Sequence, residues 1–232
     1  VIIKKKYKNQ RDEINLLKNR GNVISNNSRI ESLYIAQQKK YSIAILDDGL
    51  QQKNIKYDIK IACFNSEEGF GNGYLLPAGP LREAMYELKN YDIVFLNGDK
   101  KNKKLSKDIK NINKKIRIFE GNYVPENLEK LNRNKNFLMF CGLGNPHEFE
   151  KTLTKNKFKV KKKIIFPDHY KLSNKEFYNL KILAQKKNLN IITTEKDYIR
   201  LNSSQKKNVD YLKIKLKINK PKELEKFIDK IL

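Results

Sequence analysis

Short apolar runs alternate along the chain with longer segments whose apolar residues recur at helical spacing. Runs such as SIAIL and FLMFC are apolar on both faces, which is typical of strands covered by helices on each side. This alternation predicts an α/β protein built around β-sheet. The predicted strands are Ser42–Leu46, Ile59–Phe64, Ile93–Leu96, Ile116–Phe119, Phe137–Cys141, Ile164–Phe166, Asn190–Thr193 and Tyr211–Leu216.

Helices are expected in the segments between these strands. Pro146 and Pro221 suit the first turn of a helix, where a missing N–H costs no hydrogen bond. Ser173 is a predicted N-cap, and Glu176 three residues later completes a capping box. The predicted helices are Arg29–Gln38, Leu81–Lys89, Pro146–Lys155, Asn174–Lys187 and Pro221–Ile231.

A polar stretch rich in Asn and Lys, Gly121–Lys135, separates two sets of predicted strands. Such stretches favour a domain boundary. The sequence therefore predicts a first domain over residues 1–120, a linker over 121–135, and a smaller α/β domain over 136–232.

The composition is that of a globular protein, with 39% hydrophobic and 10% aromatic residues. No apolar run approaches the roughly 18–20 residues that cross a bilayer, and the first residues do not form a signal peptide. Cys63 and Cys141 lie in apolar strand-like runs. Two buried thiols in a reducing cytoplasm are expected, rather than a disulfide or a metal site.

The net charge of +24 leaves several interpretations open. Lys, Asn and Ile dominate throughout, as an AT-rich genome would impose on neutral surface positions. Alternatively, the charge attracts the protein to an anionic lipid surface. Because the lysines are spread along the chain without a nucleic-acid-binding motif, nucleic acid is not an expected partner.

The segment ILDDGLQQ holds the sharpest local signal. An apolar strand delivers Asp47 and Asp48 to its carboxyl end, where ligands bind in open α/β sheets. Adjacent carboxylates at such a position can hold Mg²⁺, as a Walker B acid does. The alternative is an Asp-Asp-Gly turn without a ligand.

A second segment, GFGNGYLLPAGPLREAM, contains glycines and prolines that fix a loop whose backbone can approach a ligand closely. Asn72 in this loop is a candidate for nucleotide or substrate binding. Arg82 could clamp phosphate, and Glu83 could join a metal site. Alternatively, Arg82 and Glu83 are ordinary charges in the first turn of a helix.

Three further segments follow predicted strands. His169 lies beside Asp168 in FPDHY and is either an acid–base group or a structural histidine. Lys196, in TTEKD, could meet phosphate or simply begin a helix. CGLGNP lacks the third glycine of a dinucleotide fingerprint, so it is only weak evidence for NAD binding.

Taken in order, these motifs resemble the tetraacyldisaccharide 4'-kinase family. The matching strings are LDDGLQ, GNGYLLPAGPLRE, GLGNP, FPDHY and TTEKD, and the resemblance runs from about Asp12 to the C-terminus. It implies an α/β/α P-loop kinase domain joined to a second α/β domain. It also implies transfer of the ATP γ-phosphate to the 4'-hydroxyl of a tetraacylated disaccharide 1-phosphate, in lipid A biosynthesis. The enzyme would work peripherally at the cytoplasmic face of the bacterial inner membrane, against its anionic surface.

The resemblance also implies roles for individual residues. Asp47, Asp48 and Glu83 would hold Mg²⁺, while Arg82 would contact the nucleotide, and Gln51 matches the Gln that follows the DDG turn.

In the family, the general base is an Asp supported by a His, and Asp12 and His169 occupy those places here. Arg11 and Ile14 stand where the family has Gly and Pro around the Asp, and Gln52 stands where many relatives have His.

No G-x-x-x-x-G-K-[ST] loop occurs in the 232 residues. Such a loop cradles phosphates in P-loop enzymes. The sequence therefore predicts a kinase domain without its N-terminal part, and a polypeptide that binds ATP poorly. The alternatives are a noncatalytic basic α/β module that binds anionic lipid or nucleic acid, and a P-loop enzyme with a different acceptor.

Overall fold

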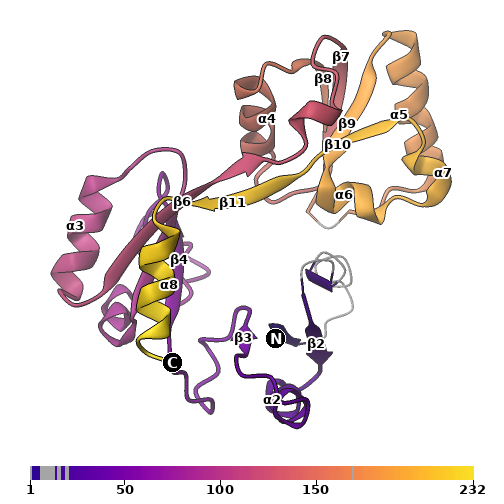
Figure 1. Ribbon diagram of the computed structural model, residues 1–232. Helices are drawn as coiled ribbons and strands as arrows, with labels where there is room; N and C mark the ends of the chain where they lie inside the picture. Colours follow the sequence, from indigo (N-terminus) through magenta and orange to yellow (C-terminus); the bar gives the residue numbers. More distant parts are fainter. Residues whose placement is uncertain (1, 6–13, 15–16, 19–20, 169) are drawn as a thin grey trace. The chain divides into compact units, whose positions relative to one another are not determined.

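The computed structural model describes residues 2–5, 14, 17–18, 21–168 and 170–232 (Figure 1). The chain forms two compact units. The first unit contains residues 1–49 and 125–214, and the second contains residues 50–124 and 215–232. Both units are built on parallel strands, and each is described by itself below.

The larger sheet of the first unit has the strand order β10-β9-β7-β8. β7 pairs in parallel with β8 and β9, and β9 pairs in parallel with β10. The elements of this sheet and its helices are β7 (Asn136–Cys141), α4 (Pro146–Lys155), β8 (Lys159–Ile165), α5 (Asn174–Lys186), β9 (Asn190–Thr194), α6 (Glu195–Arg200), α7 (Ser203–Lys206) and β10 (Val209–Leu212).

Strand β7 is an interior strand of this sheet. Helices cover both of its faces, with α4 on one side and α5 on the other (Figure 1). Successive side chains of a strand point to opposite faces. Phe137 and Met139 accordingly pack with Phe149 and Leu153 of α4. Leu138 and Phe140 pack instead against a set from the other face, which includes Phe177, Leu180 and Ala184 of α5.

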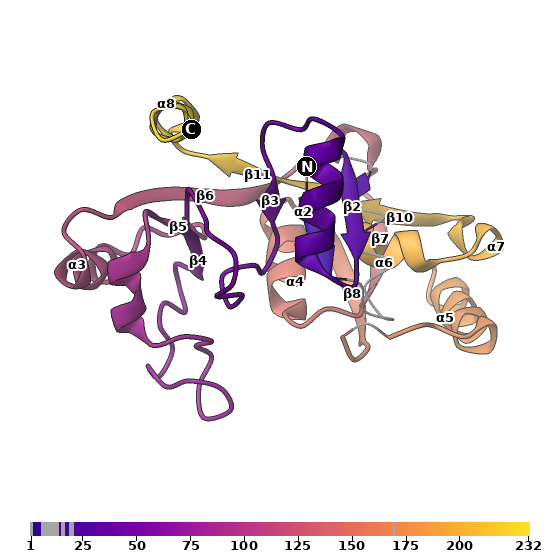
Figure 2. The ribbon, with the colours of Figure 1, turned by 90° about the horizontal axis from the view of Figure 1, so that it is seen from below.

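The first unit also contains a smaller parallel sheet with the strand order β2-β1-β3. Its strands are β1 (Ile2–Lys5), β2 (Val23–Asn26) and β3 (Ile45–Leu46), and α2 (Arg29–Gln38) lies between the last two in sequence. Figure 2 shows α2 lying along β2. Ser28 caps α2 by accepting a hydrogen bond from the Glu31 amide.

The second unit contains a sheet with the strand order β11-β6-β5-β4. β4, β5 and β6 are parallel neighbours. The elements are β4 (Ile61–Asn65), the 3₁₀ helix η1 (Met85–Asn90), β5 (Ile93–Asn97), α3 (Lys103–Ile112), β6 (Arg117–Pro125), β11 (Ile214–Ile218) and α8 (Pro221–Asp229).

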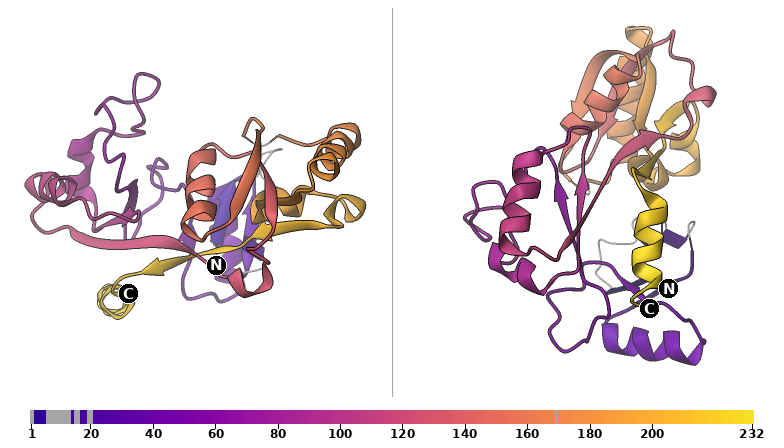
Figure 3. Two further views of the ribbon diagram at one scale, coloured as in Figure 1. Left: turned by 90° about the horizontal axis from the view of Figure 1, so that it is seen from above. Right: turned by 60° about the vertical axis from the view of Figure 1, so that its left-hand side comes forward.

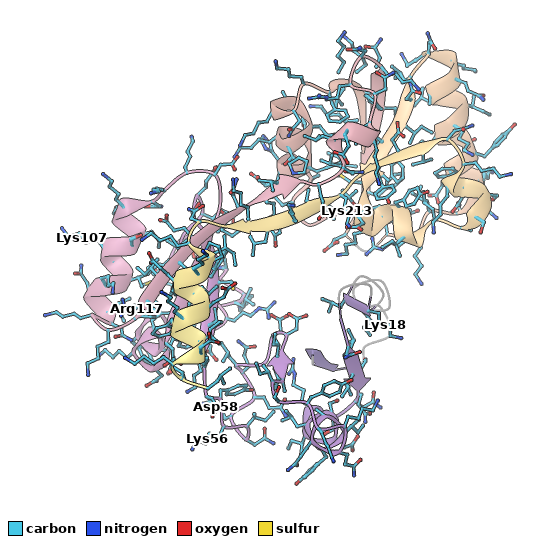
Figure 4. The ribbon with its side chains drawn as sticks, in the orientation of Figure 1. Lys18, Lys56, Asp58, Lys107, Arg117 and Lys213 are labelled. Atoms are coloured by element: carbon cyan, nitrogen blue, oxygen red, sulfur yellow. The ribbon has the colours of Figure 1, made fainter. Side chains whose placement is uncertain are left out.

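Strand β5 repeats in this unit the arrangement of β7. Val94 and Leu96 pack with Leu105 and Ile109 of α3. Ile93 and Phe95 face the other layer, where Leu224 and Phe227 of α8 lie. Figure 3 shows α3 and α8 on opposite sides of the sheet. The Arg117 guanidinium lies 5.7 Å from the centroid of the Phe227 ring, and Figure 4 shows Arg117 beside α8.

Strands β6 and β11 carry the chain from one unit into the other. They run antiparallel, because the Glu126 amide donates to the Lys213 carbonyl while the Asn219 amide donates to the Glu120 carbonyl. The stretch expected as a linker, 121–135, holds the end of β6 and the short 3₁₀ helix η2 (Leu128–Lys130). The division into domains over 1–120 and 136–232 stays a prediction.

Three predicted elements were wrong. The strand expected over Ser42–Leu46 is shortened to Ile45–Leu46, and Ile43 and Ile45 are exposed rather than covered on both faces. The strand expected over Tyr211–Leu216 is two strands, because the backbone of Lys213 bonds to Glu126 and to the Asn127 side chain and thereby leaves the larger sheet. The helix expected over Leu81–Lys89 is a 3₁₀ helix that begins at Met85. An isolated bridge between Leu75 and Leu81 keeps the preceding backbone extended.

The cysteines agree only partly with expectation. Cys141 is fully buried, whereas Cys63 is exposed, so the prediction of two buried thiols was wrong for Cys63. Burial, with the nearby Asp197 carboxylate, raises the pKa of the Cys141 thiol to about 12. No helix in the described residues is both long and apolar enough to cross a membrane.

The packing of β7 predicts a large loss of stability for Phe137→Ala. Phe137 is fully buried, and its ring lies 5.5 Å from that of Phe158. We expect the free energy of unfolding to fall by about 3–5 kcal/mol in urea denaturation. Tyr178→Ala is the control, since this ring in α5 is 63% exposed and its removal should cost less than about 0.5 kcal/mol. Equal losses for the two variants would contradict the assigned core.

The two thiols should differ in alkylation by iodoacetamide at pH 8. The raised pKa keeps Cys141 almost entirely in the unreactive thiol form at that pH. Burial also blocks access to it. We expect the exposed Cys63 to be modified first, and Cys141 to react only after unfolding, as measured by mass spectrometry of peptides. Early modification of Cys141 would show that this strand is not buried.

Candidate functional site

Asp47 and Asp48 stand where the sequence places them, directly after β3 at the carboxyl end of a parallel strand. The strand is only two residues long, and both aspartates lie in a turn. Asp48 has a φ of 52°, in the left-handed region that Asp tolerates better than most residues. The buried Gly49 follows.

Arg29 fixes the backbone of this turn. Its Nη2 atom donates to the main-chain oxygens of Asp47 and Asp48, at 2.8 Å in each case. Arg29 is the first residue of α2, directly after the capping Ser28. The start of α2 and the carboxyl end of β3 are therefore held together, a connection that the sequence did not reveal.

The glycine-rich loop of the second unit is held by the side chain of Asn72. Its Nδ2 atom donates to the Ala78 carbonyl at 2.8 Å, and its Oδ1 atom accepts from the Tyr74 amide at 3.1 Å. A Cβ atom on Gly79 would lie 2.2 Å from the Asn72 Oδ1 atom, so this position requires glycine. Asn72 thus shapes the loop, and its predicted role toward a nucleotide or substrate stays a prediction.

Arg82 and Glu83 follow this loop but precede η1, so they do not lie in a first helical turn as expected. Arg82 is exposed. The Glu83 carboxylate accepts a short hydrogen bond of 2.5 Å from the Tyr91 hydroxyl. Burial and this bond raise the pKa of Tyr91. A carboxylate that accepts one hydrogen bond retains lone pairs for a cation.

Asp47 and Asp48 belong to the first unit, whereas Arg82 and Glu83 belong to the second. Their predicted meeting in one cleft stays a prediction. In the described part of the chain, no group of three or more His, Cys, Asp or Glu residues is close enough to hold a metal ion. Gln51 is exposed in the turn after the aspartates.

The other three motifs share the carboxyl edge of the larger sheet. GLGNP follows β7, FPDHY follows β8, and TTEKD spans the end of β9 and the start of α6. A Cβ atom on Gly142 would lie 3.1 Å from the Pro167 carbonyl oxygen, and one on Gly144 would lie 3.5 Å from the Asp168 carboxylate. The loops are therefore in close contact.

Asp197 joins two of these motifs from a buried position. Its Oδ2 atom accepts from the Gly142 amide at 3.0 Å and from the Thr194 hydroxyl at 2.8 Å. Its Oδ1 atom pairs with Arg200 at 3.1 Å, and both side chains are 6% exposed. A buried ion pair that also satisfies backbone donors holds the loops in one arrangement.

Lys196 begins the same helix, with its Nζ atom 3.8 Å from the Asp168 carboxylate. This pair places a cation and an anion at the edge where the three motifs meet. The predicted catalytic residues Asp12 and His169 both lie outside the described residues.

Sequence reasoning missed Asp197 although it stands in the TTEKD string. A sequence signal was present. Thr194 and Asp197 have the spacing of a helix N-cap and an acidic residue three positions after it. Arg29 gave no comparable signal, since its partners are main-chain atoms 18 and 19 residues away.

The family model for tetraacyldisaccharide-1-P 4'-kinase matches residues 3–232. A tetraacyldisaccharide 4'-kinase of Pelagibacter ubique (strain HTCC1062) is 44% identical over 224 residues, which cover 96% of this chain and 71% of the relative. The chain belongs to this family. A second relative with the same name, from Rickettsia bellii (strain OSU 85-389), is 36% identical over 90% of this chain and 64% of its own length.

A solved structure supports the same assignment. The crystal structure of LpxK from Aquifex aeolicus in complex with ATP superposes with a TM-score of 0.63 and 25% identity, over 90% of this chain and 64% of that chain. The resemblance inferred from the motifs is therefore confirmed, and so is the α/β fold of P-loop kinase type. The chain spans about two thirds of the length of the relatives that it matches.

The buried network predicts a large effect of Asp197→Ala. The change leaves the Arg200 guanidinium and the Gly142 amide without this carboxylate, so the free energy of unfolding should fall by about 3–5 kcal/mol. Asp197→Asn retains an acceptor and should cost less. Lys220→Ala, which removes the exposed pair with Glu223, is the control and should change stability by less than about 1 kcal/mol in urea denaturation. An Asp197→Ala variant as stable as this control would refute the network.

Proposed function

We propose that the protein carrying this chain is an ATP-dependent kinase. It transfers the γ-phosphate of ATP to the 4'-hydroxyl of a tetraacyldisaccharide 1-phosphate, in lipid A biosynthesis. The observation that carries the proposal is the family match over residues 3–232, within which Asp47 and Asp48 stand at the carboxyl end of a parallel strand. The names of the relatives and the ATP complex of the Aquifex enzyme support the same reaction.

The donor set of the aspartate turn fits Mg²⁺, which takes carboxylate and phosphate oxygens. Asp47 and Asp48 would supply the carboxylates, with Glu83 from the second unit. When bound, the ion neutralises negative charge on the transferred phosphoryl group. Because Arg29 holds the main-chain oxygens of the turn, the two carboxylates start from a fixed backbone.

The remaining predicted residues have roles in binding and proton transfer. Arg82, Gln51 and Lys196 would contact the nucleotide or the phosphorylated acceptor, and phosphoryl transfer depends mainly on such positioning and charge. Asp12, supported by His169, would accept the proton of the attacking 4'-hydroxyl.

A peripheral contact with an anionic membrane completes the proposal. The acceptor is an acylated lipid, and the chain carries a net charge of +24. Basic side chains project from elements throughout both units (Figure 4). Such a charge attracts a protein to anionic lipid, and the cytoplasmic face of the inner membrane is the expected location.

The aspartate turn gives the decisive test. Asp47→Asn keeps the size of the side chain but removes a charge that Mg²⁺ needs. We expect kcat/KM for phosphoryl transfer to fall at least about a hundredfold in the natural protein that contains this sequence. Asp229→Asn, a matched change at an exposed position of α8, should leave kcat/KM within about twofold.

An alternative outcome separates the proposal from a noncatalytic basic module. Such a module would show no phosphoryl transfer in either variant. Its binding to anionic vesicles would weaken steeply with salt, and Asp47→Asn would leave that binding unchanged. Transfer that survives Asp47→Asn unchanged would refute the proposed role of the turn.

A further inference from the structure

The second unit has a polar pocket that lies apart from the predicted residues of its glycine-rich loop. It sits where β4 and β5 end, beside the middle of β6, at the carboxyl edge of these two strands, which is where open α/β sheets bind ligands. Its volume is about 120 Å³. The lining residues are Ser66, Leu96, Gly98, Asp99, Lys100, Lys101, Glu120, Asn122 and Asn219.

Ser66 gives the pocket an unsatisfied hydroxyl. The residue is 4% exposed, and its Oγ atom has no hydrogen-bond partner among the described residues. Its backbone is fixed, because its amide donates to the Asn97 carbonyl and its carbonyl accepts from the Asn102 Nδ2 atom, at 2.9 Å in both cases. A buried hydroxyl without a partner is costly, so its presence on a pocket wall points to a ligand that completes it.

Gly98 leaves the space that this buried hydroxyl occupies. A Cβ atom at position 98 would lie 2.0 Å from the Ser66 Oγ atom, so any other residue would displace the hydroxyl. The Gly98 amide donates to the Gly121 carbonyl at 2.9 Å, which fixes the wall. Asn97, the residue before Gly98, has a buried Oδ1 atom that also lacks a partner in the described part of the chain.

The lining chemistry favours a neutral, hydroxyl-bearing ligand. Two carboxylates, Asp99 and Glu120, balance two ammonium groups, Lys100 and Lys101, so the wall has no excess charge for an anion. The Asn122 Nδ2 atom donates to Asp99 at 2.9 Å and orients that carboxylate. No aromatic ring is present among the described lining residues to stack on a base.

The volume limits the ligand to about one ring. A single water needs only about 10–15 Å³ by a comparable measure, so the pocket exceeds the room for one water several times over. Pockets that enclose a whole drug-sized ligand start at about 300 Å³. One sugar ring of a larger ligand fits between these limits.

We propose that this pocket binds a sugar ring, with the Ser66 hydroxyl hydrogen-bonded to one of the ring hydroxyls. Asp99 and Asn122, which also line the pocket, bind neighbouring hydroxyls. The proposal rests on the proposed function, which supplies two such rings, the ribose of ATP and the disaccharide of the acceptor. Their shared chemistry is a ring with adjacent hydroxyls.

The test uses the natural protein that contains this sequence and compares its binding of two probes in titrations followed by NMR, which detects millimolar affinities. The probes are ATP and a water-soluble disaccharide 1-phosphate without acyl chains. Ser66→Ala should weaken the binding of one probe about three- to tenfold, the effect of one lost hydrogen bond. Gly98→Ala should act in the same direction. Ser106→Ala is the matched control, because that hydroxyl donates to the carbonyl of Asn102, the N-cap of α3, and does not line the pocket.

The pattern of losses identifies the source of the ring. If ribose binds, 2'-deoxy-ATP or 3'-deoxy-ATP should lose the same factor as Ser66→Ala, and combining the two changes should cost nothing more. If the acceptor sugar binds, only the disaccharide should weaken. Unchanged affinity for both probes in Ser66→Ala, or no binding of either probe, would overturn the proposal and leave only water at this hydroxyl.

Measurements of the Tm and of phosphoryl transfer distinguish a lost sugar contact from unfolding and from failure of the proposed function. Removing a buried hydroxyl that lacks a partner should not lower the Tm, so a loss of affinity in Ser66→Ala cannot come from unfolding. If the protein transfers phosphate but Ser66→Ala does not change the affinity for either probe, the pocket proposal is refuted and the proposed kinase function stands. If Ser66→Ala weakens the binding of a probe but the protein transfers no phosphate, the proposed kinase function is refuted and the pocket proposal stands.

Discussion

The parallel pairing of strands is the constraint on which this molecule depends. Parallel neighbours end at the same edge of a sheet, so loops that are far apart in sequence must come together there. In the first unit, this edge gathers the GLGNP, FPDHY and TTEKD loops, and the buried Asp197 ties two of them to each other. In the second unit, the same rule brings Ser66 and Gly98, which follow β4 and β5, to one pocket beside Glu120 of β6.

Both units meet a second condition of parallel sheets, which is that both faces of the central strand are covered. This condition made β5 and β7 easy to predict, because a short, continuous apolar run between polar segments is typical of a strand buried on both faces. The same condition accounts for the failures. β8 lies at an edge of its sheet and tolerates lysines, so only its last residues look like a strand. α3 was missed although its buried Leu105 and Ile109 have helical spacing, because the lysines between them make the segment look like a polar loop.

In the site, features that depend on residues adjacent in sequence could be predicted, whereas features that depend on distant residues could not. The position of the aspartate turn after a strand was predicted correctly because a strand, two carboxylates and a glycine are adjacent in sequence, while its role toward Mg²⁺ stays a prediction. The hydrogen bond of Glu83 could not be predicted, since its partner Tyr91 lies beyond the end of η1, eight residues away. Ser66 lies in no motif, and its significance comes from Gly98, which directly follows the neighbouring strand β5. Residues that act through tertiary contacts leave little trace in a single sequence.

The clamp that Asn72 forms within the glycine-rich loop has a consequence for affinity. With its amide bonded at both ends, and with Gly71 and Gly79 closely packed against Pro80 and Tyr74, the loop has few alternative conformations to lose. A ligand that meets a preorganised surface does not have to order it, so more of the contact free energy remains as binding. Glycine, usually a source of flexibility, here permits the tight packing that makes the loop rigid.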